Sequence, residues 1–248
     1  CYALSIVAFL LWVRLGRAAW PARAQWRHLG VTGILMHGGY LGGVWLAVKH
    51  GMGAGTSALV IGLQPVLTAL WVSASGQEHR VSARQWLGLA LGLAGLVLVL
   101  WRKLGVGEVD AFNLACVIAA LLAITAGTLY QKRHVEPCDV RTANAVQLMA
   151  AFVVTVPLTV FESGAMELHP DLIVAMGWSV LALTLGGSSL LYLLIQRGAA
   201  TRVSSLMYLV PPCTAVFGWL LFDEDLGAPV LAGLALTALG VALVVRPR

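Results

Sequence analysis

The sequence predicts an all-α membrane protein: a polytopic helical bundle with two inverted five-helix repeats, of which nine spans out of ten are present. Three observations predict this fold. Apolar residues make up 59% and charged residues 11% of the 248 residues, whereas charged residues approach a quarter of a soluble domain. All 16 basic and 11 acidic residues fall between charge-free windows. Segments about 145 residues apart also resemble each other.

Nine charge-free windows correspond to the predicted spans. Most approach the ~20 residues that a helix needs to cross roughly 30 Å of hydrocarbon, and helices satisfy their backbone hydrogen bonds internally, as lipid requires. The segments between the windows are too short to hold a further domain. The windows cover residues 1–13, 29–48, 54–74, 85–101, 111–130, 142–161, 172–196, 203–222 and 228–245.

Basic residues predict how the spans are oriented, because short cytoplasmic loops carry an excess of Lys and Arg. When the connecting segments are assigned alternately to the two membrane faces, 13 Lys and Arg fall on one face and 3 on the other. The sequence therefore predicts a multi-pass protein of the bacterial inner membrane. Its C-terminus and segment 14–28 are expected in the cytoplasm, with residue 1 outside.

An internal repeat divides the chain into two halves. GLALGLAGLVLV at 88–99 matches GLALTALGVALV at 233–244, and GAGT at 53–56 matches GAAT at 198–201. We expect a first repeat over 1–103, with four spans, and a second over 104–248, with five. Projected back by about 145 residues, window 111–130 falls before residue 1, so a first helix is expected to be missing. An odd number of spans per repeat inverts the second copy, as in many secondary transporters.

The paired motifs of the two halves carry a family resemblance. QPVLTALW (64–71) with Glu78 and a Gly-rich helix (86–100) parallels PPCTAVFGWLLFDED (211–225) with a Gly-rich helix (232–245). In these motifs the chain resembles EamA-type permeases of the drug/metabolite transporter superfamily. The resemblance implies a permease or exporter of amino acids, sugars, other metabolites or drugs, built from two five-helix repeats.

His37 is the one ionisable side chain of the His, acidic or basic type within a window. It lies near mid-span, with Tyr40 at i+3 and glycines around it. Polar groups in spans are costly unless they are paired or face a cavity. Two interpretations stay open: a neutral histidine that is hydrogen-bonded across a helix contact, or a group that contacts substrate or couples protons.

Other polar residues within the spans extend the set of cavity candidates. Thr184, Ser188, Tyr192 and Gln196 recur every four residues and predict one polar stripe along a helix, which faces a cavity or a neighbouring helix. Gln64, Thr68 and Gln147 line a cavity or join helices to each other. The full set of candidates is His37, Tyr40, Gln64, Thr68, Gln147, Ser188, Tyr192, Gln196 and Tyr208.

Prolines and glycines within the spans suggest structural roles. Pro65, Pro211 and Pro212 are expected to kink their helices, either as fixed bends or as hinges. The spacings Gly38/Gly42, Gly39/Gly43 and Gly88/Gly92 predict close helix packing. Glu78 and Glu224 are interpreted as loop or helix-end residues, and salt-bridge locking of one gate stays open as the alternative.

Enzyme motifs are absent from the sequence, which contains no GxSxG, HExxH or P-loop pattern. The sequence therefore predicts a transporter that works by alternating access, with an integral-membrane enzyme or a non-transporting scaffold as alternatives. We expect no cofactor, no metal and no nucleic-acid partner. The expected partners are lipid and a small solute, uncharged or zwitterionic, with an amphipathic cation near the tyrosines left open. The expected state is a monomer or homodimer, and proton coupling through His37 stays open.

Overall fold

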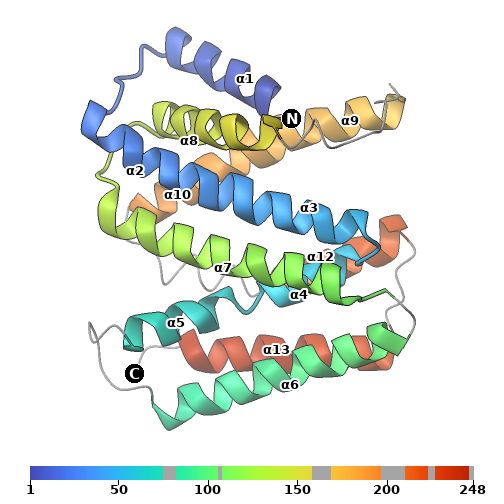
Figure 1. The fold of residues 1–248 in the computed structure, drawn as a ribbon. Helices are drawn as coiled ribbons and strands as arrows, with labels where there is room; N and C mark the ends of the chain where they lie inside the picture. Colours follow the sequence, from blue (N-terminus) through green and yellow to red (C-terminus); the bar gives the residue numbers. More distant parts are fainter. Residues whose placement is uncertain (75–81, 106–107, 158–168, 197–209, 223–226, 246–248) are drawn as a thin grey trace. The chain divides into compact units, whose positions relative to one another are not determined.

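A computed structural model describes residues 1–74, 82–105, 108–157, 169–196, 210–222 and 227–245 (Figure 1). Over these ranges the regular structure is helical, with no strand, as the composition predicts. Three helical stretches are long and apolar enough to cross a membrane: Arg23–Lys49, Ala111–His134 and Leu172–Leu193. The count of nine spans stays a prediction.

The chain forms two compact units, and each takes residues from both sequence halves. Residues 1–39 and 126–199 form unit 1, and residues 40–125 and 200–248 form unit 2. This division rests on contacts in space and the proposed repeats rest on sequence similarity, so the two need not coincide. The repeat boundaries near residue 103 remain a prediction.

In unit 1 the central helix is α8 (Val140–Thr155), which contacts α1 (Tyr2–Leu15), α2 (Arg23–Gly33) and α10 (Ser189–Gln196). Figure 1 shows α1 and α8 side by side. Every residue of α8 from position 142 to 148 is buried. The apolar contacts around α8 form two clusters, which include Phe9, Leu29, Ala145, Leu148 and Tyr192. Unit 1 also contains the start of the π-helical segment η1 (Ile34–Leu41), the end of α7 (Ala111–His134), α9 (Pro170–Trp178) and the π-helical segment η3 (Ser179–Ser188).

In unit 2 the longest contact joins α6 (Ala83–Gly105) to α13 (Ala228–Val245), which lie side by side in Figure 1. α5 (Gln64–Ala74) packs on α13, and α4 (Ala54–Ile61) packs on α12 (Val210–Phe222). The core cluster of this unit includes residues of α3 (Gly42–Lys49), α4 and the first half of α7.

Glycines allow α6 and α13 to touch at the backbone. A Cβ on Gly95 would lie 2.5 Å from the Gly233 carbonyl oxygen and 2.6 Å from Thr237 Oγ1. A Cβ on Gly240 would meet the Gly88 carbonyl and, at 2.5 Å, the Gly92 nitrogen. The predicted Gly88/Gly92 packing face is therefore present. At Gly38 and Gly42, by contrast, an added Cβ meets no described atom within 4 Å. Close packing at this pair was a wrong expectation. At Gly43, by contrast, an added Cβ would lie 2.8 Å from the Cys116 carbonyl oxygen and 2.9 Å from the Ala120 Cβ, so close packing is present at this glycine.

The helix starts of the two halves follow the predicted offset. η1 and η3 begin 145 residues apart, at Ile34 and Ser179. The starts of α6 and α13 are likewise 145 residues apart. The glycine contacts are also reciprocal, because Gly95, Gly88 and Gly92 become Gly240, Gly233 and Thr237 when 145 is added. Such reciprocity is typical of two-fold related elements, and the repeat itself stays a prediction.

One predicted window is divided in two. Residues 54–74 form α4 and α5, which are separated by a turn at Gly62 and Leu63. Pro65 is the second residue of α5, where the missing N–H leaves no helical bond unmade. Pro65 therefore starts a helix, whereas it was expected to bend a continuous one. Pro211 and Pro212 lie in α12 directly after residues that the structure does not describe, so the kinks expected there stay a prediction.

Candidate functional site

His37 and Gln147 form a buried polar pair in unit 1. His37 lies in η1 and Gln147 in α8, and both side chains are buried. The two side chains are joined by a hydrogen bond. The hydroxyl of Tyr2, on α1, donates to the main-chain oxygen of His37 at 2.7 Å. Three segments distant in sequence therefore meet at this histidine.

The pair lies far from the ends of its helices. His37 is fourteen residues after Arg23 and twelve before Lys49 within the continuous apolar stretch Arg23–Lys49. Its segment, η1, is π-helical, and π-helical turns inside α-helices often occur at functional sites. The geometry thus places a titratable side chain in the middle of a helix that is long enough to span a membrane.

Close backbone packing fixes the position of Gln147. A Cβ on Gly33 would lie 2.5 Å from the Cα of Gln147, so α2 and α8 touch without an intervening side chain. Gly30, one turn earlier, faces Ala150. The main chain that carries Gln147 is thereby held against the helix that leads into η1.

The amide nitrogen of Gln147 has no hydrogen-bond partner among the described residues, although the side chain is buried. A buried polar atom without a partner costs about 1–3 kcal/mol. Ser5, Ser57 and Ser189 also have unpaired hydroxyls. A serine on a helix can rotate toward the carbonyl four residues back, as Thr32 does at 2.8 Å, so the serine atoms carry less weight than the amide.

The predicted polar stripe is only partly formed. Residues 179–188 are π-helical, so a spacing of four residues does not keep one face there, and Thr184 donates to the carbonyl of Ser179 five residues back. Ser188 is half-buried. Tyr192 is buried, with its hydroxyl 3.0 Å from the Cys138 sulfur. The side chain of Gln196 lies outside the described part of the chain.

The remaining cavity candidates belong to unit 2 or are not described. Tyr40 is half-buried near the end of η1. Gln64 is buried at the start of α5, and its main-chain oxygen accepts a bond from the Thr68 hydroxyl at 2.9 Å. The hydroxyl of Thr68 thus finds its hydrogen-bond acceptor within its own helix. Tyr208, Glu78 and Glu224 fall outside the described residues.

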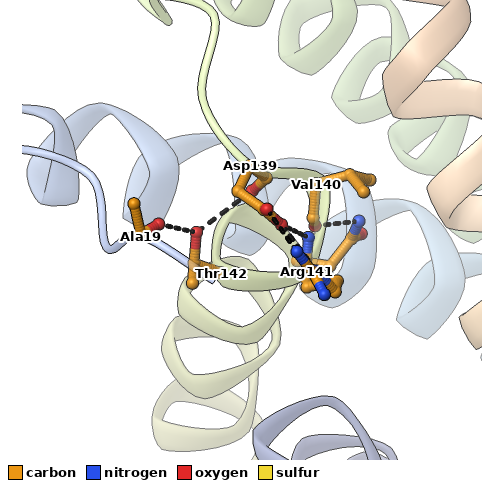
Figure 2. Close-up of polar contacts among 6 residues, drawn as sticks. Ala19, Asp139, Val140, Arg141 and Thr142 are labelled. Carbon is orange, nitrogen blue, oxygen red and sulfur yellow. Dashed lines mark hydrogen bonds and ion pairs between the residues drawn. The ribbon is translucent and has the colours of Figure 1, made fainter. Parts of the chain in front are cut away.

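The N-terminus of α8 is held by a second polar cluster (Figure 2). Asp139 caps the helix by accepting from the Arg141 main-chain nitrogen at 2.9 Å, and Arg141 Nη2 donates to its other oxygen at 2.7 Å. The Thr142 hydroxyl lies 3.1 Å from the carbonyl oxygens of both Ala19 and Asp139. The hydrogen bond from the Arg141 side chain lowers the pKa of Asp139 below its ordinary value. This cluster ties the connection between α1 and α2 to the helix that carries Gln147.

Cys138 precedes this cluster, in the connection between α7 and α8. Burial raises the pKa of its thiol above the ordinary value, and the hydrogen bond with Tyr192 opposes the rise. A thiol whose pKa is raised is a weak nucleophile and a weak metal ligand. The contact is therefore best interpreted as packing between α10 and the start of α8.

Glu108 has a role that its sequence context did not predict. Its Oε1 accepts from the main-chain nitrogen of Gly53 and from the Thr56 hydroxyl, each at 2.9 Å, and so caps α4. Asn113 holds the same region by donating to the carbonyls of His50 and Glu108. The sequence did contain one indication of this role. The GAGT segment at 53–56 begins a helix but has no acidic residue that could cap it, so a cap from elsewhere in the chain was needed.

Comparisons with known proteins identify the family. A model of the EamA-like transporter family matches residues 112–246. An uncharacterized transporter of Archaeoglobus fulgidus is 24% identical over 96% of this chain and 82% of its own length. A transporter of Synechocystis is 25% identical, with coverages of 96% and 77%. A probable amino-acid metabolite efflux pump of Salmonella typhimurium is 23% identical, with coverages of 84% and 73%. Since the family model matches more than half of the residues, the resemblance found in the sequence is confirmed, and the chain belongs to the EamA-like transporter family.

Proposed function

We propose that this protein is a permease or exporter that moves small organic solutes across the bacterial inner membrane by alternating access between two inverted repeats. Family membership supports the general activity. The relative named as a probable amino-acid metabolite efflux pump makes amino acids and related metabolites the first solutes to test. We expect an uncharged or zwitterionic solute, because the three long helices contain no acidic residue.

The observation that carries this proposal is the buried pair of His37 and Gln147 within apolar helices. Polar groups inside a span are costly and usually mark a substrate or ion pathway. The pair is held by packing on both sides, through the Tyr2 bond to His37 and the contact of Gly33 with the Gln147 backbone. Both features are expected of a rigid binding site.

Two further observations support the alternating-access part of the proposal. Two pairs of helix starts, those of η1 and η3 and those of α6 and α13, are 145 residues apart, and the glycine contacts between α6 and α13 are reciprocal. Inverted repeats place solute sites near the bilayer midplane, at the repeat interface. The proposed orientation, with the C-terminus in the cytoplasm, rests on the 13 to 3 division of basic residues.

Transport by the full-length protein in proteoliposomes tests the proposal. We expect uptake of labelled neutral amino acids to be saturable and to be stimulated by unlabelled solute inside the vesicles. Replacing His37→Ala removes the partner of Gln147 and should reduce uptake by about tenfold or more. If His37 also couples protons, the variant loses its response to a pH gradient.

His50→Ala provides a matched control. His50 is exposed at the end of α3, and its ring lies edge-on to Phe112. Asn113 donates a hydrogen bond to the main-chain oxygen of His50, which the substitution keeps. Uptake and its pH dependence should be unchanged in this variant. Equal uptake by the wild type and His37→Ala would remove His37 from the solute pathway.

A further inference from the structure

The geometry points to Gln147 as the group that recognises an oxygen acceptor of the solute, a carboxylate or a carbonyl, through its amide nitrogen. This inference rests on the proposed transport function and adds the chemistry of one contact. Within the described helices of unit 1, Gln147 is the only buried polar side chain with an unpaired nitrogen.

The orientation of the amide follows from its partners. Gln147 is 2% exposed, and its Nε2 has no partner among the described residues. The hydrogen bond that joins its side chain to His37 therefore uses the amide oxygen, with the imidazole N–H as donor. The oxygen is thus occupied, and the nitrogen keeps two unused protons.

Among the residues that the structure describes, none accepts a hydrogen bond from Gln147 Nε2. The charged residue nearest to Gln147 along α8 is Arg141, a cation whose guanidinium is paired with Asp139 at the start of the helix. The polar neighbour Asn144 is equally buried, at 1% exposure, but its Nδ2 donates to the carbonyl of Val140 at 2.9 Å. α8 therefore carries two buried amides three residues apart, one satisfied internally and one not.

The unused donor selects the class of ligand atom. An amide N–H₂ can only donate, so it binds carboxylate, carboxamide or other carbonyl oxygens and does not bind an ammonium group. Sites that hydrogen-bond a substrate group discriminate strongly against analogues that lack it. We therefore expect the transporter to prefer amino acids and their amides to the corresponding amines.

Matched solutes and matched variants test this assignment. The probes are labelled L-leucine, L-leucinamide and 3-methylbutylamine, together with the corresponding triplets of other neutral amino acids, assayed for exchange in proteoliposomes of the full-length protein. The acid presents a carboxylate, the amide a neutral carbonyl and the amine no oxygen, so the three arms separate the two acceptor types. For a transported triplet we expect the wild type to prefer an oxygen-bearing member over the amine by at least about tenfold.

Gln147→Glu is the decisive variant, because it keeps the oxygen that accepts from His37 and replaces the donor with a second oxygen. The preference for oxygen-bearing solutes should fall by about tenfold or more. Asn144→Asp makes the same chemical change one turn away and should leave the preference unchanged. A ratio between solutes within one preparation does not depend on how much of each variant folds.

The outcomes separate this assignment from the proposed function. Equal transport of the amine by the wild type, or an unchanged preference in Gln147→Glu, overturns the assignment and leaves transport intact. Exchange of no triplet by the wild type contradicts the proposed function, and the assignment falls with it.

Discussion

Replacing Gly240→Ala should destabilise the contact between α6 and α13. The added Cβ would lie 2.5 Å from the Gly92 nitrogen and 2.9 Å from the Gly92 Cα, whereas ordinary contacts begin near 3.4 Å. These are backbone atoms, which cannot rotate away, so the helices must separate by roughly 1 Å locally. A gap of that size forfeits about a quarter to a half of each dispersion contact along the seam. We expect a loss of about 1–3 kcal/mol, the usual cost of overpacking.

Replacing a glycine that has open space around it should change the stability in the opposite direction. At Gly177, in α9, an added Cβ meets no described atom within 4 Å, and alanine is the better helix former by up to about 1 kcal/mol. Gly177→Ala should therefore be neutral or stabilising. Both variants can be compared by unfolding purified protein in detergent, followed by circular dichroism. A Gly240→Ala protein as stable as Gly177→Ala would refute the close packing of α6 on α13.

Three further predictions concern polar contacts near helix ends. Because the pKa of Asp139 is lowered in the folded protein, its contribution to stability is present above the unfolded value of 3.8 and is lost as pH falls through the folded value. The stability advantage of the wild type over Asp139→Asn should therefore shrink from pH 7 to pH 3, and a constant difference would contradict the ion pair. Glu108→Ala should destabilise the start of α4 by about 1 kcal/mol, seen as faster hydrogen exchange there, while Glu108→Gln keeps an acceptor oxygen and should exchange more slowly than Glu108→Ala. Tyr192→Phe removes the hydrogen bond that opposes the rise in the pKa of the Cys138 thiol. The thiolate fraction should then fall and maleimide should label that thiol more slowly, so unchanged labelling would argue against the contact.

The sequence predicts helices well where one apolar window forms one helix. The window 228–245 coincides with α13, and the window 111–130 lies within α7. The break at Gly62 and Leu63 is not visible in hydropathy, because both residues suit a membrane interior as well as a turn. The π-helical segments were also missed, since a periodicity search assumes the α-helical repeat.

The candidate site was also predicted only in part from the sequence. His37 and Gln147 were each found because a polar side chain inside an apolar window is conspicuous. Their pairing was not predicted, because it depends on how η1 and α8 are rotated about their axes. Tyr2 contributes through the main-chain oxygen of His37, and Glu108 through the main-chain nitrogen of Gly53. Bonds to main-chain atoms leave no trace in side-chain patterns.

Solute counterflow tests the central claim most directly. Proteoliposomes that contain the full-length wild-type protein are preloaded with an unlabelled neutral amino acid, and the same labelled solute is added outside at a lower concentration. A transporter with one alternating-access site predicts transient accumulation of label that saturates with solute and is absent from protein-free vesicles. Accumulation equal to that of protein-free vesicles across the amino acids, amides and amines would contradict the account.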